Sequence, residues 1–203
     1  TAFDPVSVRK LQRWPQRWSK VASGEVTNVP LLREIAKQKR PILLSTGMST
    51  LSEVEFAIKT LTDAGADRSK LTVMHCNTEY PTPLEDVNLH AIQTLKNELN
   101  VDVGYSDHTL SVDVPVAAVA LGSCVIEKHL TLNQSFDGPD HQASLEPNLF
   151  KEMVSKIRAI ELALGDGIKR PSASEVKNIA IARRSIVASK KIKLGERFSE
   201  SNL

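Results

Sequence analysis

The stretch VDVGYSDHTL (residues 101–110) decides the fold class, because it joins a short apolar run to a polar end, Ser106-Asp107-His108. Four other short apolar runs, at residues 19–22, 41–44, 71–74 and 124–126, also end in polar residues. All five runs lack a regular alternation of apolar and polar residues, as is typical of strands buried on both faces of a parallel sheet. The sequence therefore predicts five parallel strands with polar side chains at their carboxyl ends.

Amphipathic stretches separate these runs and predict helices. Thr50 and Glu53 have the spacing of a capping box at the start of the first such stretch. A second stretch covers residues 88–99, and a third begins near Pro147 and ends before Gly165. Strand and helix thus alternate along the chain, which predicts an α/β fold.

Two α/β architectures fit this alternation: an open doubly wound sheet and a closed (β/α)₈ barrel. No G-x-G-x-x-G or P-loop motif follows the first run, so the usual nucleotide signature of the open sheet is missing. An open sheet concentrates its site at one switch point, whereas a barrel gathers the carboxyl ends of all its strands around one mouth. Polar residues after all five strands therefore favour the barrel.

The composition is that of an ordinary folded domain. The 203 residues are enough for a sizeable core, and 41% hydrophobic with 25% charged residues argue against disorder. The aromatic content of 4% gives little support for base stacking, so no nucleic-acid partner is expected. Cys76 and Cys124 form no paired framework, which suits a reducing compartment. No signal-peptide pattern or membrane-length apolar stretch occurs, so we expect a cytoplasmic protein without a membrane partner.

The composition of the sequence becomes more polar near its C-terminus. We expect residues 1–167 to form the barrel part, residues 168–181 to form a linker, and residues 182–203 to begin a second domain. Residues 185–188 (SIVA) are expected to form a strand of that domain. The chain starts with threonine rather than methionine and stops abruptly, so we expect it to be part of a longer protein.

His108 and His129 follow consecutive predicted strands. Two neutral imidazoles at a barrel mouth, with positions left open for water and substrate, would suit a catalytic divalent metal. Asp107 and Glu127, their neighbours in sequence, would support them from behind. The alternative is two unrelated histidines that end strands, and two ligands alone do not decide between these interpretations.

Small hydroxyl residues also follow the strands. Ser23, Ser45 and Ser106 lie at strand ends, and Lys20 supplies a nearby cation. Hydroxyls and exposed backbone N–H groups beside a cation are typical of a phosphate cradle. Ordinary turn chemistry is the alternative, because serine and glycine are favoured in any loop.

Tyr80 and Asp140 each allow two interpretations. Asp140 lies in the segment Gly138-Pro139-Asp140-His141, which is either a plain turn or a lid that brings a carboxylate over the mouth. Tyr80 either packs or contacts a ligand. His75 lies within an apolar run and is expected in the core or behind the site.

These motifs together resemble the sialic acid synthase family, which includes the N-acetylneuraminate, legionaminate and pseudaminate synthases. The matching segments keep their order along nearly the whole chain: KVASGEVTN (20–28), PILLSTGMSTLSEVEFA (41–57), HCNTEYPTPLEDVNL (75–89), VGYSDHTL (103–110), AAVALGSCVIEKHLTL (117–132), GPDHQASLEP (138–147) and ARRSIVASKKIKLGE (182–196). GYSDHTL and EKHLTL followed by GPDH are the most specific of them.

The resemblance implies a (β/α)₈ TIM barrel followed by a small SAF (antifreeze-like) domain, working as a domain-swapped homodimer. TAFD (residues 1–4) resembles the end of the third barrel strand, so the chain would hold strands four to eight, the linker and the start of the SAF domain. Family residues from the first two strands and an arginine of the partner's SAF domain would be missing. We therefore expect residues 1–203 alone neither to fold stably, since open parallel edges remain, nor to catalyse.

The resemblance also implies a reaction. In the family, phosphoenolpyruvate condenses with the open-chain aldehyde of an N-acylated mannosamine-type sugar, giving a nonulosonic acid and phosphate. A divalent metal, commonly Mn²⁺ with Mg²⁺ or Co²⁺ as options, would be held by His108 and His129 and would polarise the aldehyde. Other phosphoenolpyruvate-dependent sugar-acid aldol synthases, and an inactive fragment, are the alternatives.

Individual roles carry over on the matching positions. The resemblance assigns phosphoenolpyruvate binding to Lys20, Ser23, Ser45, Thr78 and Ser106, an acid near the metal and the attacking water to Glu25, and sugar contacts to Tyr80 and Asp140. Thr78 departs from the family's usual asparagine, which puts the geometry of that phosphate contact in doubt. The HCNTEYPTP form resembles the legionaminate type more than the N-acetylneuraminate type. The sequence alone does not decide between their acceptor sugars.

Overall fold

The structure, a computed structural model, describes all 203 residues as two compact units, Thr1–Gly165 and Asp166–Leu203. No helix of the chain is both long enough and apolar enough to cross a membrane.

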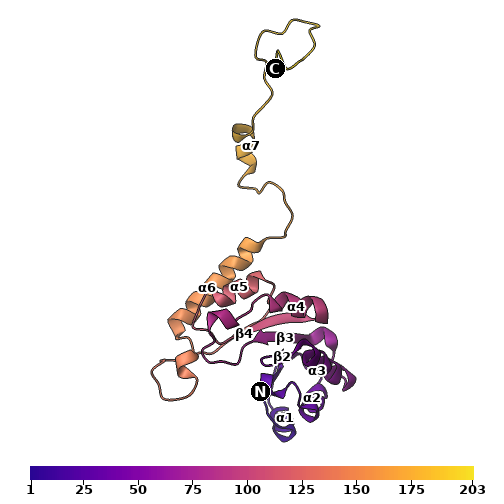
Figure 1. Cartoon of the computed structure of the whole chain (residues 1–203), viewed down its shortest axis with the longest axis vertical. Coiled ribbons are helices and arrows are strands. Elements are labelled where there is room, and N and C mark those ends of the chain that lie inside the picture. Colours follow the sequence, from indigo (N-terminus) through magenta and orange to yellow (C-terminus); the bar gives the residue numbers. More distant parts are fainter. The chain divides into compact units, whose positions relative to one another are not determined.

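The first unit is built on a five-stranded parallel sheet whose strands follow the chain order, β1-β2-β3-β4-β5 (Figure 1). Its strands are β1 (Ser19–Val21), β2 (Ile42–Ser45), β3 (Leu71–Cys76), β4 (Asp102–Asp107) and β5 (Ile126–Lys128). Every neighbouring pair is parallel. A doubly wound sheet reverses its strand order at a switch point. The order here never reverses, so the sheet is a half-barrel, and the predicted choice of barrel over open sheet is confirmed.

Helices connect the strands. Those of the first unit are α1 (Pro5–Leu11), α2 (Val29–Ala36), α3 (Leu51–Asp63), α4 (Ala91–Leu99), α5 (Val114–Ala120) and α6 (Pro147–Leu164). Short 3₁₀ turns occur at Ser23–Glu25, Arg68–Lys70, Leu84–Asp86 and His141–Ala143. The predicted capping box is confirmed at the start of α3, where Thr50 and Glu53 each accept a hydrogen bond from the other's backbone N–H. The three helices expected from amphipathic patterns are α3, α4 and α6.

The two faces of the sheet differ in chemistry. Side chains alternate between the faces of a strand, so residues two apart share a face. Val21, Leu44, Val73 and Val103 belong to the hydrophobic core that the sheet forms with the helices. The residues between them turn to the other face, which is the inner face of the half-barrel. That face carries the polar strand-end residues, so the pleat itself separates core from site.

Two local expectations differ from the structure. Residues 1–4 are not in a strand, because Asp4 instead caps α1 by accepting a hydrogen bond from the Ser7 N–H. The fourth strand runs on to Asp107, and the fifth begins at Ile126 rather than at residue 124. The polar ends of both strands therefore belong to the paired sheet, which fixes their side chains more firmly than a loop would.

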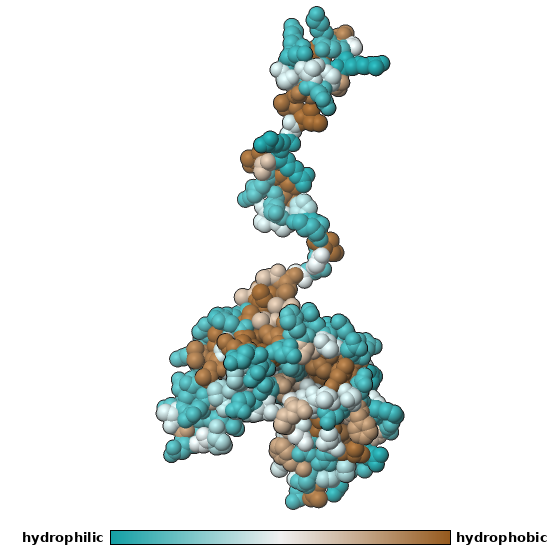
Figure 2. Space-filling view, viewed as in Figure 1, coloured by the Kyte–Doolittle hydropathy of each residue, from teal (hydrophilic) through white to brown (hydrophobic).

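The second unit contains one helix, α7 (Val176–Ala182), inside the segment expected to be a linker. Residues 185–188 are not a strand, contrary to expectation, because no neighbouring segment pairs with their backbone. Ile181, Ile186 and Leu194 are exposed. Figure 2 shows brown patches among the hydrophilic surface of this unit. Asn202 is its buried residue, held by hydrogen bonds to Arg197 and Glu196. The unit therefore has no apolar core of its own.

Candidate active site

One cavity of about 360 Å³ opens at the carboxyl ends of the strands. Each strand contributes one inner-face residue to its wall: Lys20, Ser45, Cys76, Ser106 and Glu127. Eight of the ten residues singled out from the sequence line it: Lys20, Ser23, Ser45, Thr78, Tyr80, Ser106, His108 and His129. The sheet thus gathers side chains that lie more than a hundred positions apart in the sequence.

The strand register explains why these side chains meet. Cys76 pairs with Ser106 between β3 and β4, and Ser106 pairs with Glu127 between β4 and β5. Paired residues of neighbouring strands point to the same face. The Ser106 hydroxyl accordingly donates a hydrogen bond to Glu127 Oε1 at 2.8 Å.

Lys20 approaches the same carboxylate from β1. Its Nζ lies 3.3 Å from Glu127 Oε1, and both side chains are partly exposed. Glu127 therefore links the two outer strands of the half-barrel across the cavity. Its Oε1 contacts both the ammonium of Lys20 and the hydroxyl of Ser106. An anionic ligand could take the place of this oxygen as their partner.

The loop after β2 comes very close to the loop after β1. The Gly47 N–H donates a hydrogen bond to Ser23 Oγ at 3.0 Å. A Cβ at Gly47 would lie 2.6 Å from Thr78 Cγ2, closer than such atoms pack, and 3.0 Å from Ser23 Oγ, a tight contact. Only glycine allows this approach. Gly47 thus brings two of the predicted phosphate ligands, Ser23 and Thr78, together.

Ser45 has a buried hydroxyl without a partner. Its Oγ faces no hydrogen-bonding group, although the residue is only 2% exposed and lines the cavity. A buried unsatisfied hydroxyl is unfavourable by about 1–3 kcal/mol, so native structures avoid it. An oxygen of a bound ligand would satisfy it.

The two histidines and Tyr80 form an aromatic cluster at one side of the cavity. The ring centroids of His108 and His129 are 5.4 Å apart and the rings are nearly perpendicular. Tyr80 lies 4.1 Å from the His108 ring and 5.5 Å from the His129 ring. The three rings therefore lie against one another.

His108 has a defined tautomer. Its Nδ1 lies 2.5 Å from the carbonyl oxygen of Asn77. A carbonyl only accepts, so Nδ1 carries the hydrogen and Nε2 is left with a free lone pair. Metal-binding histidines are typically oriented in this way by a backbone carbonyl. Burial lowers the pKa of His108, the hydrogen bond to Asn77 opposes this shift in part, and the neighbouring His129 adds to it.

The histidine pair stands without a third protein ligand. No group of three or more His, Cys, Asp or Glu side chains is arranged to hold a metal ion. Two imidazoles, one with a fixed tautomer and a free Nε2, nevertheless fit a catalytic cation whose other positions are taken by water and substrate.

Glu25 and Asp140 lie away from the cavity wall. Glu25 belongs to the 3₁₀ turn after β1, and its Oε2 accepts a hydrogen bond from the Asn28 amide at 2.6 Å. Asp140 approaches the histidine pair, with its Oδ2 3.9 Å from His129 Nδ1. Burial raises the pKa of Tyr80, and the Asp140 carboxylate adds to the effect.

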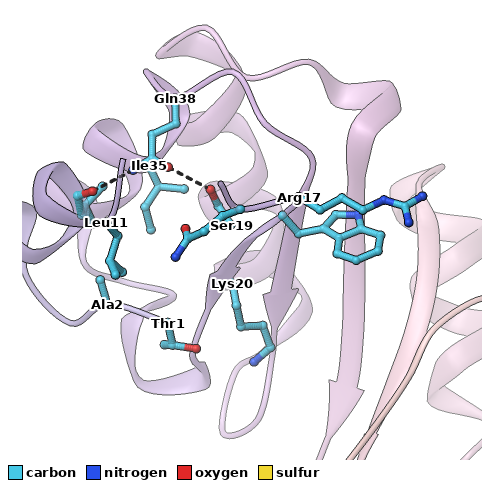
Figure 3. A pocket seen from close by; sticks show the side chains of 11 residues that line it. Thr1, Ala2, Leu11, Arg17, Ser19, Lys20, Ile35 and Gln38 are labelled. Atoms are coloured by element: carbon cyan, nitrogen blue, oxygen red, sulfur yellow. Dashed lines mark hydrogen bonds between the residues drawn. The ribbon is translucent and has the colours of Figure 1, made fainter. Parts of the chain in front are cut away.

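A second cavity of about 280 Å³ lies at the open edge of β1. Lys20 and Thr1 line both cavities, and Figure 3 shows the Lys20 side chain extending toward Thr1. Gln38 accepts a hydrogen bond from Ser19 and donates one to the Val8 carbonyl (Figure 3). Arg17 covers the ring of Trp18 at 4.4 Å. Lys20 therefore lies between the two cavities and lines each of them.

Behind the histidines lies a buried ion pair that the sequence pattern did not identify. Asp107 Oδ2 and Lys128 Nζ are 2.5 Å apart, and both side chains are fully buried. The signal in the sequence is the repeated order charged residue–histidine, Asp107-His108 and Lys128-His129, at the ends of two neighbouring strands.

Comparison with known proteins agrees with this geometry. Residues 1–169 match the NeuB family. The chain belongs to the NeuB family. The N,N'-diacetyllegionaminic acid synthase of Campylobacter jejuni is 53% identical over 203 residues, which cover 100% of this chain and 61% of that protein. The enzyme of the same name from Legionella pneumophila is 43% identical, covering 100% of this chain and 58% of that protein.

A solved NeuB-type structure has the same fold. The crystal structure of N-acetylneuraminic acid (sialic acid) synthetase from Leptospira borgpetersenii superposes with a TM-score of 0.81 at 34% identity. The match covers 88% of this chain and 62% of that one. The chain spans about three fifths of the length of these relatives. Residues of a relative beyond that span have no counterpart in this sequence.

Proposed function

We propose that this NeuB-family chain carries the phosphoenolpyruvate- and metal-binding part of a nonulosonic acid synthase, a transferase that joins phosphoenolpyruvate to an N-acylated mannosamine-type sugar. The unsatisfied hydroxyl of Ser45 is the observation that carries this proposal, because it points to an oxygen-rich ligand. Lys20, Ser23 and Ser106 line the same cavity and supply one positive charge and two further hydroxyls. A phosphate ester with a carboxylate matches this set of groups.

The His108–His129 pair is proposed to hold a divalent cation, most simply Mn²⁺. When bound, the cation would act as a Lewis acid on the sugar's aldehyde oxygen. The chain's own contribution is to present the free Nε2 of His108 with its ring orientation fixed by Asn77. Tyr80, packed on both imidazoles, would contact the sugar beside them, and Asp140 would contact it from the loop after β5.

The proposed reaction forms one C–C bond and one C–O bond from water, breaks the C–O bond to phosphate, and returns a proton to the former aldehyde oxygen. C3 of phosphoenolpyruvate attacks the aldehyde carbon, water adds at C2, and phosphate leaves. Lys20 and the serine hydroxyls would stabilise the phosphate group both in bound phosphoenolpyruvate and as it leaves. A carboxylate must take the proton of the water. Glu25 is the residue that family resemblance assigns, and its hydrogen bond from Asn28 holds it outside the cavity wall, so a turn movement would have to bring it closer.

The acceptor sugar is proposed from relatives. A relative that is 53% identical is an N,N'-diacetyllegionaminic acid synthase, which favours a diacetamido-trideoxy sugar over N-acetylmannosamine. The remaining parts of the active site, including a SAF domain and its delivery by a partner subunit in a homodimer, belong to this proposal as well. The free cysteines suit a cytoplasmic setting.

The test uses the whole protein, with whatever residues flank this chain. Phosphate release from phosphoenolpyruvate is followed with each of the two sugars, with Mn²⁺ and after chelation. We expect release that requires both a sugar and the cation, with a higher kcat/KM for the diacetamido sugar. Phosphate release that ignores the sugar, or none with either sugar and Mn²⁺, would contradict the proposal.

A further inference from the structure

The buried ion pair between Asp107 and Lys128 lies on the face of the sheet opposite the cavity. Asp107 and Lys128 are register partners of β4 and β5, and they alternate along their strands with Ser106, His108 and Glu127. Those three residues line the cavity, so the ion pair points away from it, toward the helices. Neither charge can contact a ligand in the cavity, and any effect on the site must act through the backbone.

Lys128 binds the chain on both sides of His108. Its ammonium donates to Asp107 Oδ2 before the histidine and to the backbone carbonyl of Thr109 after it. The Asp107 carboxylate closes the same turn by accepting from the Thr109 N–H at 3.0 Å and from its hydroxyl at 3.1 Å. The Tyr105 hydroxyl donates to Asp107 Oδ1 at 3.1 Å and completes the set. His108 therefore sits at the tip of a turn that is fixed from behind.

The same lysine precedes His129. One side chain thus ties the backbone that presents His108 to the backbone that presents His129. The two strands share only three register pairs, the ion pair among them, because β5 is three residues long. A slip of one residue would turn His129 to the helix face and separate the two buried charges. Separating them is strongly unfavourable, so the ion pair selects the register in which both imidazoles face the cavity.

We propose that the Asp107–Lys128 ion pair is a positioning device that sets the separation of His108 and His129, and thereby the affinity of the site for its divalent cation. This inference rests on the proposed metal role of the two histidines. Residues that orient metal ligands from behind typically change metal affinity by about 10- to 100-fold when they are replaced. A pair that only stabilised the fold would leave the affinity of the folded protein unchanged.

The test replaces both partners at once, because removal of one would leave an unpaired buried charge. Asp107→Asn with Lys128→Met keeps the size of both side chains and removes both charges. Asp113→Asn with Lys156→Met is the matched control, since that ion pair has an N–O distance of 2.7 Å and lies at the surface. Mn²⁺ binding by the metal-free whole protein is measured by electron paramagnetic resonance without phosphoenolpyruvate. Phosphoenolpyruvate binding and the thermal melt are measured alongside.

We expect the buried double variant to melt cooperatively, to bind phosphoenolpyruvate within about threefold of wild type, and to bind Mn²⁺ about 10- to 100-fold more weakly. The surface control should match wild type in all three. Mn²⁺ affinity within threefold of wild type would overturn the inference, and so would equal losses for Mn²⁺ and phosphoenolpyruvate. If the double variant does not fold, Asp107→Glu, which keeps both charges paired but moves the carboxylate, decides by the same Mn²⁺ criterion. Wild-type protein that binds no Mn²⁺ would overturn the proposed metal site together with this inference.

Discussion

The Nδ1 of His108 donates its hydrogen to the carbonyl oxygen of Asn77 at 2.5 Å, so one strand-end loop sets the tautomer of a residue on the next strand. β3 and β4 are neighbours in the sheet, and the loop after β3 therefore lies beside the end of β4. The contact leaves Nε2 of His108 unprotonated, with a lone pair that is free to bind a ligand. This orientation would suit His108 to bind the proposed cation together with His129.

The Ser45 hydroxyl leads to a paired prediction on affinity and stability. Ser45→Ala should raise the KM for phosphoenolpyruvate by about 10- to 150-fold, because a ligand would lose one hydrogen bond to a charged group, worth about 1.5–3 kcal/mol. The melting temperature should not fall, because the free protein leaves that hydroxyl unsatisfied. Ser123→Ala is the control, since Ser123 has the other unsatisfied buried hydroxyl and lies outside the cavity. A lower melting temperature with an unchanged KM would count against the phosphate assignment.

Gly47 leads to a prediction about a substitution and a second substitution that should partly reverse its effect. Gly47→Ala should raise the KM for phosphoenolpyruvate more than the KM for the sugar, because the new Cβ would press on Thr78 and Ser23. Adding Thr78→Ser removes the methyl group that would lie 2.6 Å from that Cβ, and should restore part of the affinity. Steady-state kinetics of the single and double variants provide the measurement. A double variant no better than Gly47→Ala would show that the contact with Thr78 is not the cause.

Glu127 should compete with an anionic ligand for Lys20 and Ser106. Its Oε1 is the atom that both contact in the free protein. Glu127→Gln removes a negative charge next to the proposed phosphate, so phosphoenolpyruvate should bind several-fold more tightly in equilibrium titrations. Weaker binding instead would mean that the carboxylate is needed to orient Lys20 toward the ligand.

His75 predicts a loss of stability in mild acid. Burial lowers the pKa of this histidine, and its hydrogen bond to the Val87 carbonyl opposes the shift only in part. The unfolded chain then binds more protons than the folded chain below the ordinary pKa of about 6.5, so the free energy of unfolding falls as the pH drops through and below that value. Urea unfolding between pH 7.5 and 5 checks the slope, in steps of about 0.5 pH unit.

The matched pair for this prediction is His75→Gln and His90→Gln. His75→Gln should flatten the acid slope, whereas replacement of the exposed His90 should leave it unchanged. Equal slopes in wild type and His75→Gln would assign the acid sensitivity to other groups.

Local sequence signals were enough for the five strands, for three of the helices and for much of the cavity. Thr50 and Glu53 are three positions apart, and the capping box that they predict forms. His108 and His129 end neighbouring strands, and parallel pairing was sufficient to bring them together. Their roles stay predictions.

Long-range contacts could not be predicted in the same way. The Asp107–Lys128 pair depends on the register of two strands, and the repeated charged residue–histidine order points to it only once that register is known. The position of Glu25 was missed for a different, local reason: its carboxylate accepts a hydrogen bond from Asn28, three residues on, instead of lining the cavity. The predicted strand at residues 185–188 failed because a β-branched run forms a strand only where another backbone pairs with it.

The most direct test of the account is the Mn²⁺ dependence of phosphate release in the whole protein carrying His108→Ala and His129→Ala. Wild-type protein should release phosphate from phosphoenolpyruvate in the presence of the sugar, lose this activity on chelation and regain it with Mn²⁺. The double variant should fall by at least about 10³-fold, comparable with the loss of a main electrostatic contributor, with its melt preserved. Turnover that still rises with Mn²⁺ as in wild type would contradict the assignment of these two histidines to the cation.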